Sequence, residues 1–418
     1  MQDVPHRVPS RRPRPVGPEA SQRGAASWIL TSLLISISAG SLAGCQSPTV
    51  IEPASAEQNP SPRAAWLALR GFERGPKGAW ERRTDREARA RGLVQVDEVF
   101  VEPTAREAAG EGAYPCGDDW LTIEDANDYH SVTGREWRIS DGGFVTYSTC
   151  SRSTTEIALQ WMNHVRPELM RIFGREPETA ATVVLLRNQE QYNGFAVTQA
   201  EIGELPSDSM GWAAFHYAFP CDRWLDRAHG LEPVGAACTY WDDRTAAGNG
   251  WGPFAVRHAA VQAFVESLDP SPKAVELFLR DVEGPFPSEA FWSEKRVPLW
   301  LRYGAAMYCE RFALQPGADD PAAIRRWSLE ELEARGGPVP LETLFQFPLD
   351  STDPEASIRL LLSSGSLVTT LLDDGDGAFA APLLRFQMSL EDGVAPSEAK
   401  SAARSLEAAL LARRDSYE

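Results

Sequence analysis

Apolar residues recur in the middle of the chain at the period of two that is typical of β-strands. Residues 137–139 and 144–147 are two such runs, and the Asp-Gly-Gly turn between them predicts a β-hairpin. The continuous apolar run at residues 181–186 predicts a buried strand, and residues 237–241 predict another short strand. These segments together predict a small mixed sheet.

Apolar residues spaced three or four apart predict helices in the rest of the chain. One helix begins at Thr154 or Thr155 and ends at Gly174. Another, at residues 253–268, is apolar nearly all round, which is typical of a helix buried in a core. Pro298-Leu299-Trp300-Leu301 opens a second buried helix, which runs to Phe312. Three more helices are predicted in the last third of the chain, at residues 357–372, 378–390 and 397–414. The pattern therefore predicts an α+β fold with a helical C-terminal part.

The first 44 residues have the three parts of a secretory signal peptide: a basic start, an uncharged apolar stretch and an ending of small residues. The ending Leu42-Ala43-Gly44-Cys45 resembles a bacterial lipobox. That resemblance implies cleavage before Cys45 and a diacylglycerol on its sulfur, which would anchor the protein to a membrane of the cell envelope. By the same analogy, the absence of Asp at Gln46 favours the outer membrane. A transmembrane helix is the alternative, but the apolar core is short and holds several Ser and Gly residues.

The sequence that follows residues 1–44 divides into four parts. Residues 45–63 are rich in Ser, Pro and Ala and predict a flexible tether. Residues 64–113 form a poorly defined charged region, and we find no internal repeat in the chain. Residues 114–345 predict the α+β domain, and residues 346–418 predict the helical C-terminal part of that domain.

The charge balance of the chain excludes some classes of partner. The 418 residues carry a net charge of -18, and the first 44 residues carry five Arg against two acids, so the mature chain carries about -21. Such acidity argues against nucleic-acid partners and against binding of anionic lipid by charge. We draw no substrate from it.

Five cysteines follow Cys45, and export would place them in an oxidising space where disulfides persist. Cys116 with Cys150 and Cys221 with Cys238 are the economical pairings, because each closes a short loop, although sequence does not fix connectivity. Cys309 lies in an apolar helical pattern and is expected to be a buried thiol. The chain holds no Cys-x-x-Cys pair, which argues against a cysteine-based zinc site.

The two buried helical segments carry the pattern with the most chemical content. The first contains Arg257-His258-Ala259-Ala260-Val261-Gln262, and the second contains Pro298-Leu299-Trp300-Leu301-Arg302-Tyr303-Gly304. Together they resemble the gluzincin zinc peptidases, in particular the bacterial peptidase-MA-like group. That family has His-Glu-x-x-His on one helix and Trp-Leu-x-Glu-Gly on another, so that two His and a Glu hold zinc and a second Glu acts as general base. The resemblance covers about residues 140–415 and implies a zincin-like fold.

The residues that perform the chemistry in this family are mostly replaced. His258 stands at the first histidine position, Ala259 at the general-base position, Gln262 at the second histidine position and Tyr303 at the third-ligand position. One histidine and an amide hold zinc poorly, and Ala259 removes the base. We therefore expect a pseudoenzyme without catalytic residues or cofactor, with zinc as the alternative cofactor.

The resemblance leaves three functions open for the lipid-anchored protein. We expect a binding or scaffold protein that holds a peptide or an envelope protein, for example by strand addition at a sheet edge. An active envelope zinc metallopeptidase with atypical ligands is the first alternative, in which His258 would bind metal with Asp242, Asp243 or Glu266. A purely structural envelope lipoprotein is the second.

Overall fold

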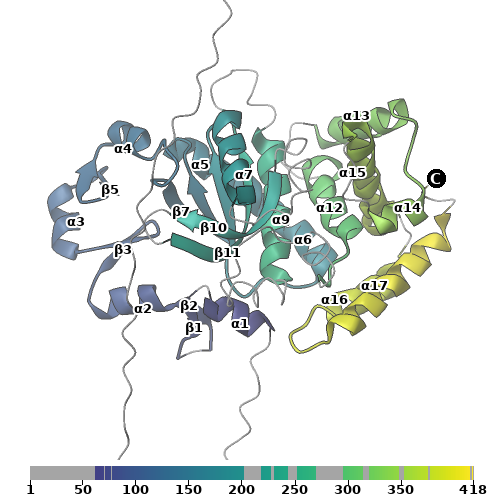
Figure 1. The fold of residues 1–418 in the computed structure, drawn as a ribbon, viewed down its shortest axis with the longest axis horizontal. Helices are drawn as coiled ribbons and strands as arrows, with labels where there is room; N and C mark the ends of the chain where they lie inside the picture. The colour runs from purple at the N-terminus through teal and green to yellow at the C-terminus, as the bar shows by residue number, and fades with distance from the viewer. Residues whose placement is uncertain are drawn as a thin grey trace, which may run out of the picture. The chain divides into compact units, whose positions relative to one another are not determined.

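The computed structural model describes residues 62–69, 71–76, 78–201, 218–226, 230–242, 252–269, 295–313, 320–347, 353–374, 377–414 and Tyr417 (Figure 1). The chain divides into two compact units, residues 1–58 and 59–418, and all described residues belong to the second unit. Residues 114–345 and 346–418 thus lie in one unit, together with residues 64–113. None of the helices in the described ranges has the length and apolarity that crossing a membrane requires.

The N-terminal part of this unit is a row of short β-hairpins, each followed by a helix. It begins with helix α1 (Pro62–Leu69). Three ββα units follow: β1 (Phe72–Arg74), β2 (Trp80–Arg82) and α2 (Arg83–Ala90); β3 (Val94–Val96), β4 (Val99–Val101) and α3 (Pro103–Ala109); β5 (Tyr114–Cys116), β6 (Asp119–Leu121) and α4 (Ile123–Tyr129). Each hairpin is a two-stranded antiparallel sheet of its own.

The three ββα units are an internal repeat with a period of 20 residues, which corrects the sequence analysis. The second strand of each unit carries an aromatic residue at equal spacing, namely Trp80, Phe100 and Trp120. Two positions later comes the residue that precedes the helix, namely Arg82, Glu102 and Thr122. Between the first two units Arg86-Glu87-Ala88 and Gly92 also recur as Arg106-Glu107-Ala108 and Gly112, so the sequence carries a signal of this repeat that the prediction missed.

Arginines of one unit cover the aromatic residue of the next. The guanidinium of Arg89 on α2 lies 5.7 Å from the ring centre of Phe100, and that of Arg106 on α3 lies 5.6 Å from the ring centre of Trp120. Such cation–π contacts contribute about 0.5–1 kcal/mol each at exposed sites. The region that the sequence left poorly defined is thus ordered by contacts between successive units.

The turn of the second hairpin attaches this row of units to the main sheet. Asp97 has a left-handed φ of 52° and receives two hydrogen bonds from the guanidinium of Arg152, at 2.6 and 2.8 Å. The adjacent Glu98 donates its backbone N–H to the carbonyl of Arg138, at 3.1 Å. Arg138 and Arg152 belong to the hairpin and helix at residues 137–164, which follow the third unit, so these contacts fix the second unit on the edge of the main sheet.

The main sheet has five strands in the order β10-β11-β9-β8-β7. Its members are β7 (Trp137–Asp141), β8 (Phe144–Ser148), β9 (Ala181–Leu186), β10 (Ala218–Asp226) and β11 (Gly230–Tyr240). The central strand β9 is parallel to both neighbours, whereas the hairpins β7–β8 and β10–β11 are antiparallel, so the sheet is mixed. The predicted hairpin and the predicted strand at 181–186 are confirmed, and the predicted strand at 237–241 is the end of β11.

Helices α5 (Arg152–His164) and α9 (Gly252–Leu268) cover this sheet. Helix α5 packs on β7 and β8, α9 packs on β9, β10 and β11, and the two helices also contact each other. The helix predicted to end at Gly174 is in fact two helices, α5 and α6 (Arg166–Phe173), because Pro167 favours a new first turn after Val165. The connection to β10 begins with α7 (Gln189–Glu201).

The remaining described elements, all after α9, are helices. Helix α12 (Leu299–Met307) continues as a π-helical turn, η2 (Tyr308–Phe312), and α15 (Pro354–Thr369) continues as a second one, η3 (Thr370–Asp374). The others are α13 (Pro321–Ala334), α14 (Leu341–Gln346), α16 (Ala380–Met388) and α17 (Pro396–Leu411). The predicted core helix at 253–268, the second buried helix and the three C-terminal helices are confirmed to within a few residues. The fold is therefore α+β.

Candidate functional site

Helices α9 and α12 lie antiparallel and share a buried polar seam. His258 near the start of α9 contacts Glu310 in η2, and Glu266 near the end of α9 contacts Arg302 near the start of α12. Partner numbers fall along α12 and η2 as they rise along α9, which shows the antiparallel direction. His258, Gln262 and Glu266 are four residues apart and so lie on one face of α9.

His258 is held by a carboxylate. Its Nδ1 lies 2.9 Å from Oε2 of Glu310, and both residues are only 1% exposed. An ionised carboxylate can only accept, so Nδ1 carries the proton of this hydrogen bond. Glu310 also accepts from Nε of Arg311 at 2.7 Å, and Arg311 reaches Glu331 of α13 at 3.0 Å. A chain of alternating charges thus leads from His258 toward the surface.

Glu266 lies at the other end of the seam and receives two cations. The Nζ of Lys295 lies 2.6 Å from its Oε2, and Arg302 donates to its Oε1. Glu266 and Arg302 are fully buried, and Lys295 is 5% exposed. Charges this deeply buried persist only when they are paired, so these contacts bind the end of α9 to the start of α12.

Gln262 lies between these two pairs, one helical turn from each. It is fully buried, and neither atom of its side-chain amide has a hydrogen-bond partner in the described part of the chain. The residue opposite, midway between Arg302 and Glu310 on the facing helix, is Ala306, whose methyl group can neither donate nor accept. An amide buried in this way costs about 1–3 kcal/mol.

The other two positions of the zinc-peptidase pattern, Ala259 and Tyr303, hold buried side chains without a charge. Ala259, at the general-base position, is fully buried. Tyr303, at the third-ligand position, is 4% exposed and stacks on Phe347 with ring centres 5.1 Å apart. Burial raises the pKa of the Tyr303 hydroxyl to about 12, so it stays neutral at physiological pH.

The described residues do not bring the candidate metal ligands around His258 together. The described residues contain no group of three or more His, Cys, Asp and Glu side chains placed to hold one ion. Among the candidate partners of His258, Glu266 is occupied by Lys295 and Arg302, and Asp243 lies outside the described residues. Asp242 is partly exposed after the end of β11 and adopts a left-handed φ of 45°.

Among the side chains that the structure describes, Cys116, Cys150 and Cys238 form no disulfide, and the side chain of Cys221 lies outside them. Cys116 and Cys150 are both buried thiols, and the Sγ of Cys116 lies 3.4 Å from Nε2 of His130. Cys238 is a buried thiol, and in the ladder it stands opposite Phe219, two positions from the partner of Cys221. Each pairing was inferred from short loops in the sequence, which do not report the strand register or the contact of Cys116 with His130. The predicted buried thiol of Cys309 is confirmed, whereas Cys45 lies outside the described residues.

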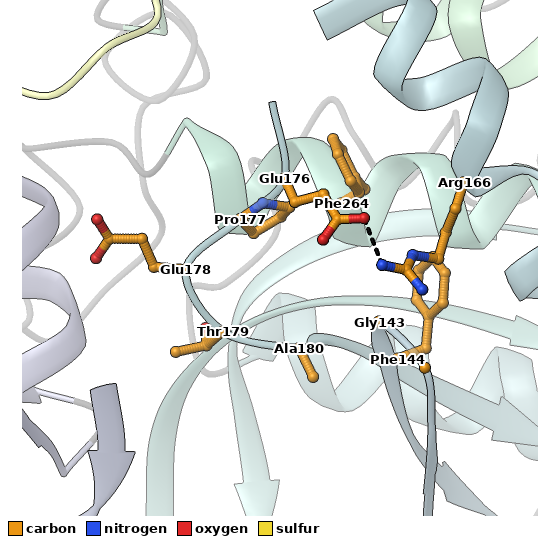
Figure 2. Close-up of a pocket in the computed structure, with 10 residues that line it drawn as sticks. Gly143, Phe144, Arg166, Glu176, Pro177, Glu178, Thr179, Ala180 and Phe264 are labelled. Atoms are coloured by element: carbon orange, nitrogen blue, oxygen red, sulfur yellow. Dashed lines mark hydrogen bonds and ion pairs between the residues drawn. The ribbon is translucent and has the colours of Figure 1, made fainter. Parts of the chain in front are cut away.

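A separate small cavity of about 150 Å³ lies where the β7–β8 turn meets the loop that leads into β9 (Figure 2). Gly143 and Phe144 line it from the sheet, residues 176–180 from the loop, and Phe264 from α9. Arg166 forms an ion pair with Glu176 across it. The cavity is smaller than the roughly 300 Å³ from which pockets for organic ligands usually start, so it holds water or a few atoms of a ligand at most.

Sequence reasoning found His258 and Gln262 but missed the residues that partner the seam. Glu310, Arg302 and Lys295 lie in segments whose other residues are mainly apolar. Arg302 and Glu310 are eight residues apart, the same interval as His258 and Glu266, so a comparison of polar spacing in the two helices could have found them. Comparison with models of protein families, with characterised proteins and with solved structures finds no match for this chain.

Proposed function

We propose that this protein is a lipoprotein anchored to the bacterial cell envelope, with a zincin-like fold that has lost its catalytic centre and now serves binding or scaffolding. The observation that carries the loss of catalysis is the polar seam. Hydrolysis by a zinc peptidase needs about three protein ligands and a base beside an open position for water. Here the seam is closed by the hydrogen bond of His258 with Glu310 and by the ion pair of Arg302 with Glu266, and Ala259 offers no base.

The order of elements supports the zincin-like fold. A hairpin, a covering helix, a central strand and a second hairpin lead into the core helix α9, which bears His258, and α12 packs against it. His258 also keeps a carboxylate on Nδ1, an arrangement that orients the histidines of metal sites in general. The lipid anchor rests on the lipobox-like ending at Cys45.

Binding at the sheet edge is the physical route to function that needs no metal. Strand β10 is the terminal strand of the sheet, and among the described strands it pairs only with β11. The outer edge of a terminal strand presents backbone N–H and C=O groups that an extended peptide can pair with. We therefore place the expected peptide or envelope protein at β10.

The test compares the metal content of the mature chain with that of a rebuilt variant. We expect the natural chain, purified without chelator, to hold less than about a tenth of an equivalent of zinc, since a working site needs about three protein ligands. The variant Ala259→Glu, Gln262→His and Tyr303→Glu restores the family pattern and should gain about one equivalent if the fold is zincin-like. The variant with Ala259→Glu alone is the matched control and should gain none.

Each outcome addresses one part of the proposal. A folded rebuilt variant without zinc would contradict the zincin-like fold, because the restored ligands would not converge. About one equivalent in the natural chain, lost in His258→Ala, would instead favour the active peptidase. The closed seam favours the purely structural alternative. To test that alternative, a photoreactive residue is placed in β10; failure to cross-link any envelope protein would support a purely structural protein.

A further inference from the structure

The three ββα units share one scaffold but differ sharply in charge. Residues 71–92, the first unit, hold seven basic and four acidic residues, a net charge of +3. Residues 93–112 hold one basic and five acidic residues, and residues 113–134 hold no Lys or Arg and five acidic residues, so their net charges are -4 and -5. The first unit is therefore a basic segment in an otherwise acidic chain.

The reversal occurs at equivalent positions of the repeat. Arg82 and Arg91 of the first unit correspond to Glu102 and Glu111 of the second, each 20 residues later. The two units have the same order of elements, so that order alone does not require arginine at either place. Within the first unit Arg82 lies 5.6 Å from the ring centre of Phe72, whereas Arg91 is exposed.

Helix α2 presents these side chains to solvent. No residue of α2 is buried, and the side chains of Arg83, Arg86 and Arg89 are 60%, 43% and 49% exposed. Their spacing of three places them along one side of the helix. These three exposed arginines form what we call the basic face.

Acidic neighbours neutralise only part of the basic face. Glu73 contacts both Arg83 and Arg86, and Glu81 contacts Arg89 at 3.1 Å. Exposed pairs of this kind are weak, about 0–1 kcal/mol each, and they rearrange readily in the field of another charged surface. The net charge of the unit stays positive with every pair formed.

The position of the unit in the chain indicates what that surface is. Cys45 precedes Pro62, the first residue of α1, by only 16 intervening residues. Even a fully extended segment of that length spans at most about 60 Å. If Cys45 carries a lipid, α1 and the first unit are the described elements that lie nearest to the lipid along the chain.

We infer that the basic face of the first ββα unit docks on the anionic phospholipid surface of the membrane in which the protein is anchored. This inference rests on the proposed lipid anchor. Each arginine near an anionic leaflet contributes attraction that falls off within about one Debye length. The mature chain without the first unit carries about -24, so the same surface repels the rest of the protein and confines the contact to this unit. The net charge of the whole chain therefore gives no indication of this basic face.

The test uses the mature chain, residues 45–418 with Cys45→Ser, so that binding by charge is measured without a lipid. We expect it to co-sediment with vesicles that contain phosphatidylglycerol and not with pure phosphatidylcholine, and to be released by salt. The triple variant Arg83→Gln, Arg86→Gln and Arg89→Gln should bind phosphatidylglycerol vesicles about 100-fold more weakly. The matched control Arg385→Gln, Arg404→Gln and Arg413→Gln has the same net charge and should bind like the natural chain.

Equal weakening in both triple variants would overturn the inference, as would binding that ignores lipid charge or salt, or no binding at all. If the first triple variant fails to fold, chemical labelling of the natural chain tests the same contact. Anionic vesicles should protect Arg83, Arg86 and Arg89 from phenylglyoxal, and neutral vesicles should not; unchanged labelling contradicts the inference. The mass of the Cys45 peptide from cells tests the lipid anchor separately, so the two failures are distinguishable.

Discussion

Nδ1 of His258 and Oε2 of Glu310 lie 2.9 Å apart between α9 and η2, and neither residue is more than 1% exposed. In a working metal centre a carboxylate in this position orients the histidine for its ion. Here the same contact joins two helices of the core. A residue that the sequence pattern associates with catalysis therefore has a structural partner of its own.

Removal of this partner should destabilise the protein strongly. Glu310→Ala leaves His258 and Arg311 in a buried site without their carboxylate, and we expect the free energy of unfolding in urea to fall by about 3 kcal/mol. Glu342→Ala is the matched control, because that carboxylate is 53% exposed and pairs with Arg414 at the surface. It should cost less than about 1 kcal/mol. Equal losses in the two variants would contradict the importance of the buried pair.

Replacement of the buried amide of Gln262 should stabilise the protein, in contrast to the loss expected for Glu310→Ala. Gln262→Leu removes a fully buried polar group that has no hydrogen-bond partner in the described residues, and keeps a similar volume. We expect a gain of about 1 kcal/mol in the free energy of unfolding, measured by thermal or urea denaturation. A loss of more than about 1 kcal/mol would instead show that the amide has a partner in the rest of the chain.

The thiol of Cys116 should contribute to loss of stability at alkaline pH. Burial, with a smaller contribution from the charge of Asp119, raises its pKa to about 11. Above pH 9 the unfolded chain releases this proton more readily than the folded protein, so the contribution to stability present below pH 9 is lost as pH rises toward 11. The fall in unfolding free energy between these two pH values should be smaller in Cys116→Ser. An identical fall would contradict the assignment.

The turn at Asp97 should control how firmly the ββα row is attached. Asp97→Asn keeps a residue that tolerates the left-handed φ but removes the charge that pairs with Arg152. We expect a loss of about 1.5–3 kcal/mol in docking of the row, since this is the cost of a hydrogen bond to a charged group. Amide hydrogen exchange should then quicken in residues 94–109 and stay slow in β8 and β9. Uniform exchange across the chain would argue against a separate attachment.

The parts that could be predicted from the sequence are those in which a local pattern decides the structure. Strand β9 is buried on both faces and reads as an unbroken apolar run, and the Gly-Gly turn specifies the β7–β8 hairpin. Helix α9 was recognised because its apolar residues continue nearly all round, and α12 because Pro298-Leu299-Trp300-Leu301 opens an apolar helical segment. The same periodicity placed His258, Gln262 and Glu266 on one side of α9.

Only the tertiary structure decided what that side of α9 meets. The antiparallel register of α9 against α12 brings Glu310 to His258 and Arg302 to Glu266, across intervals of 52 and 36 residues. No local pattern encodes such a register, because it depends on how two surfaces fit. The order of the ββα units also depends on tertiary contacts. Each unit is too small for a core of its own, so its order comes from contacts with its neighbours, such as Arg89 over Phe100, and not from hydrophobic periodicity.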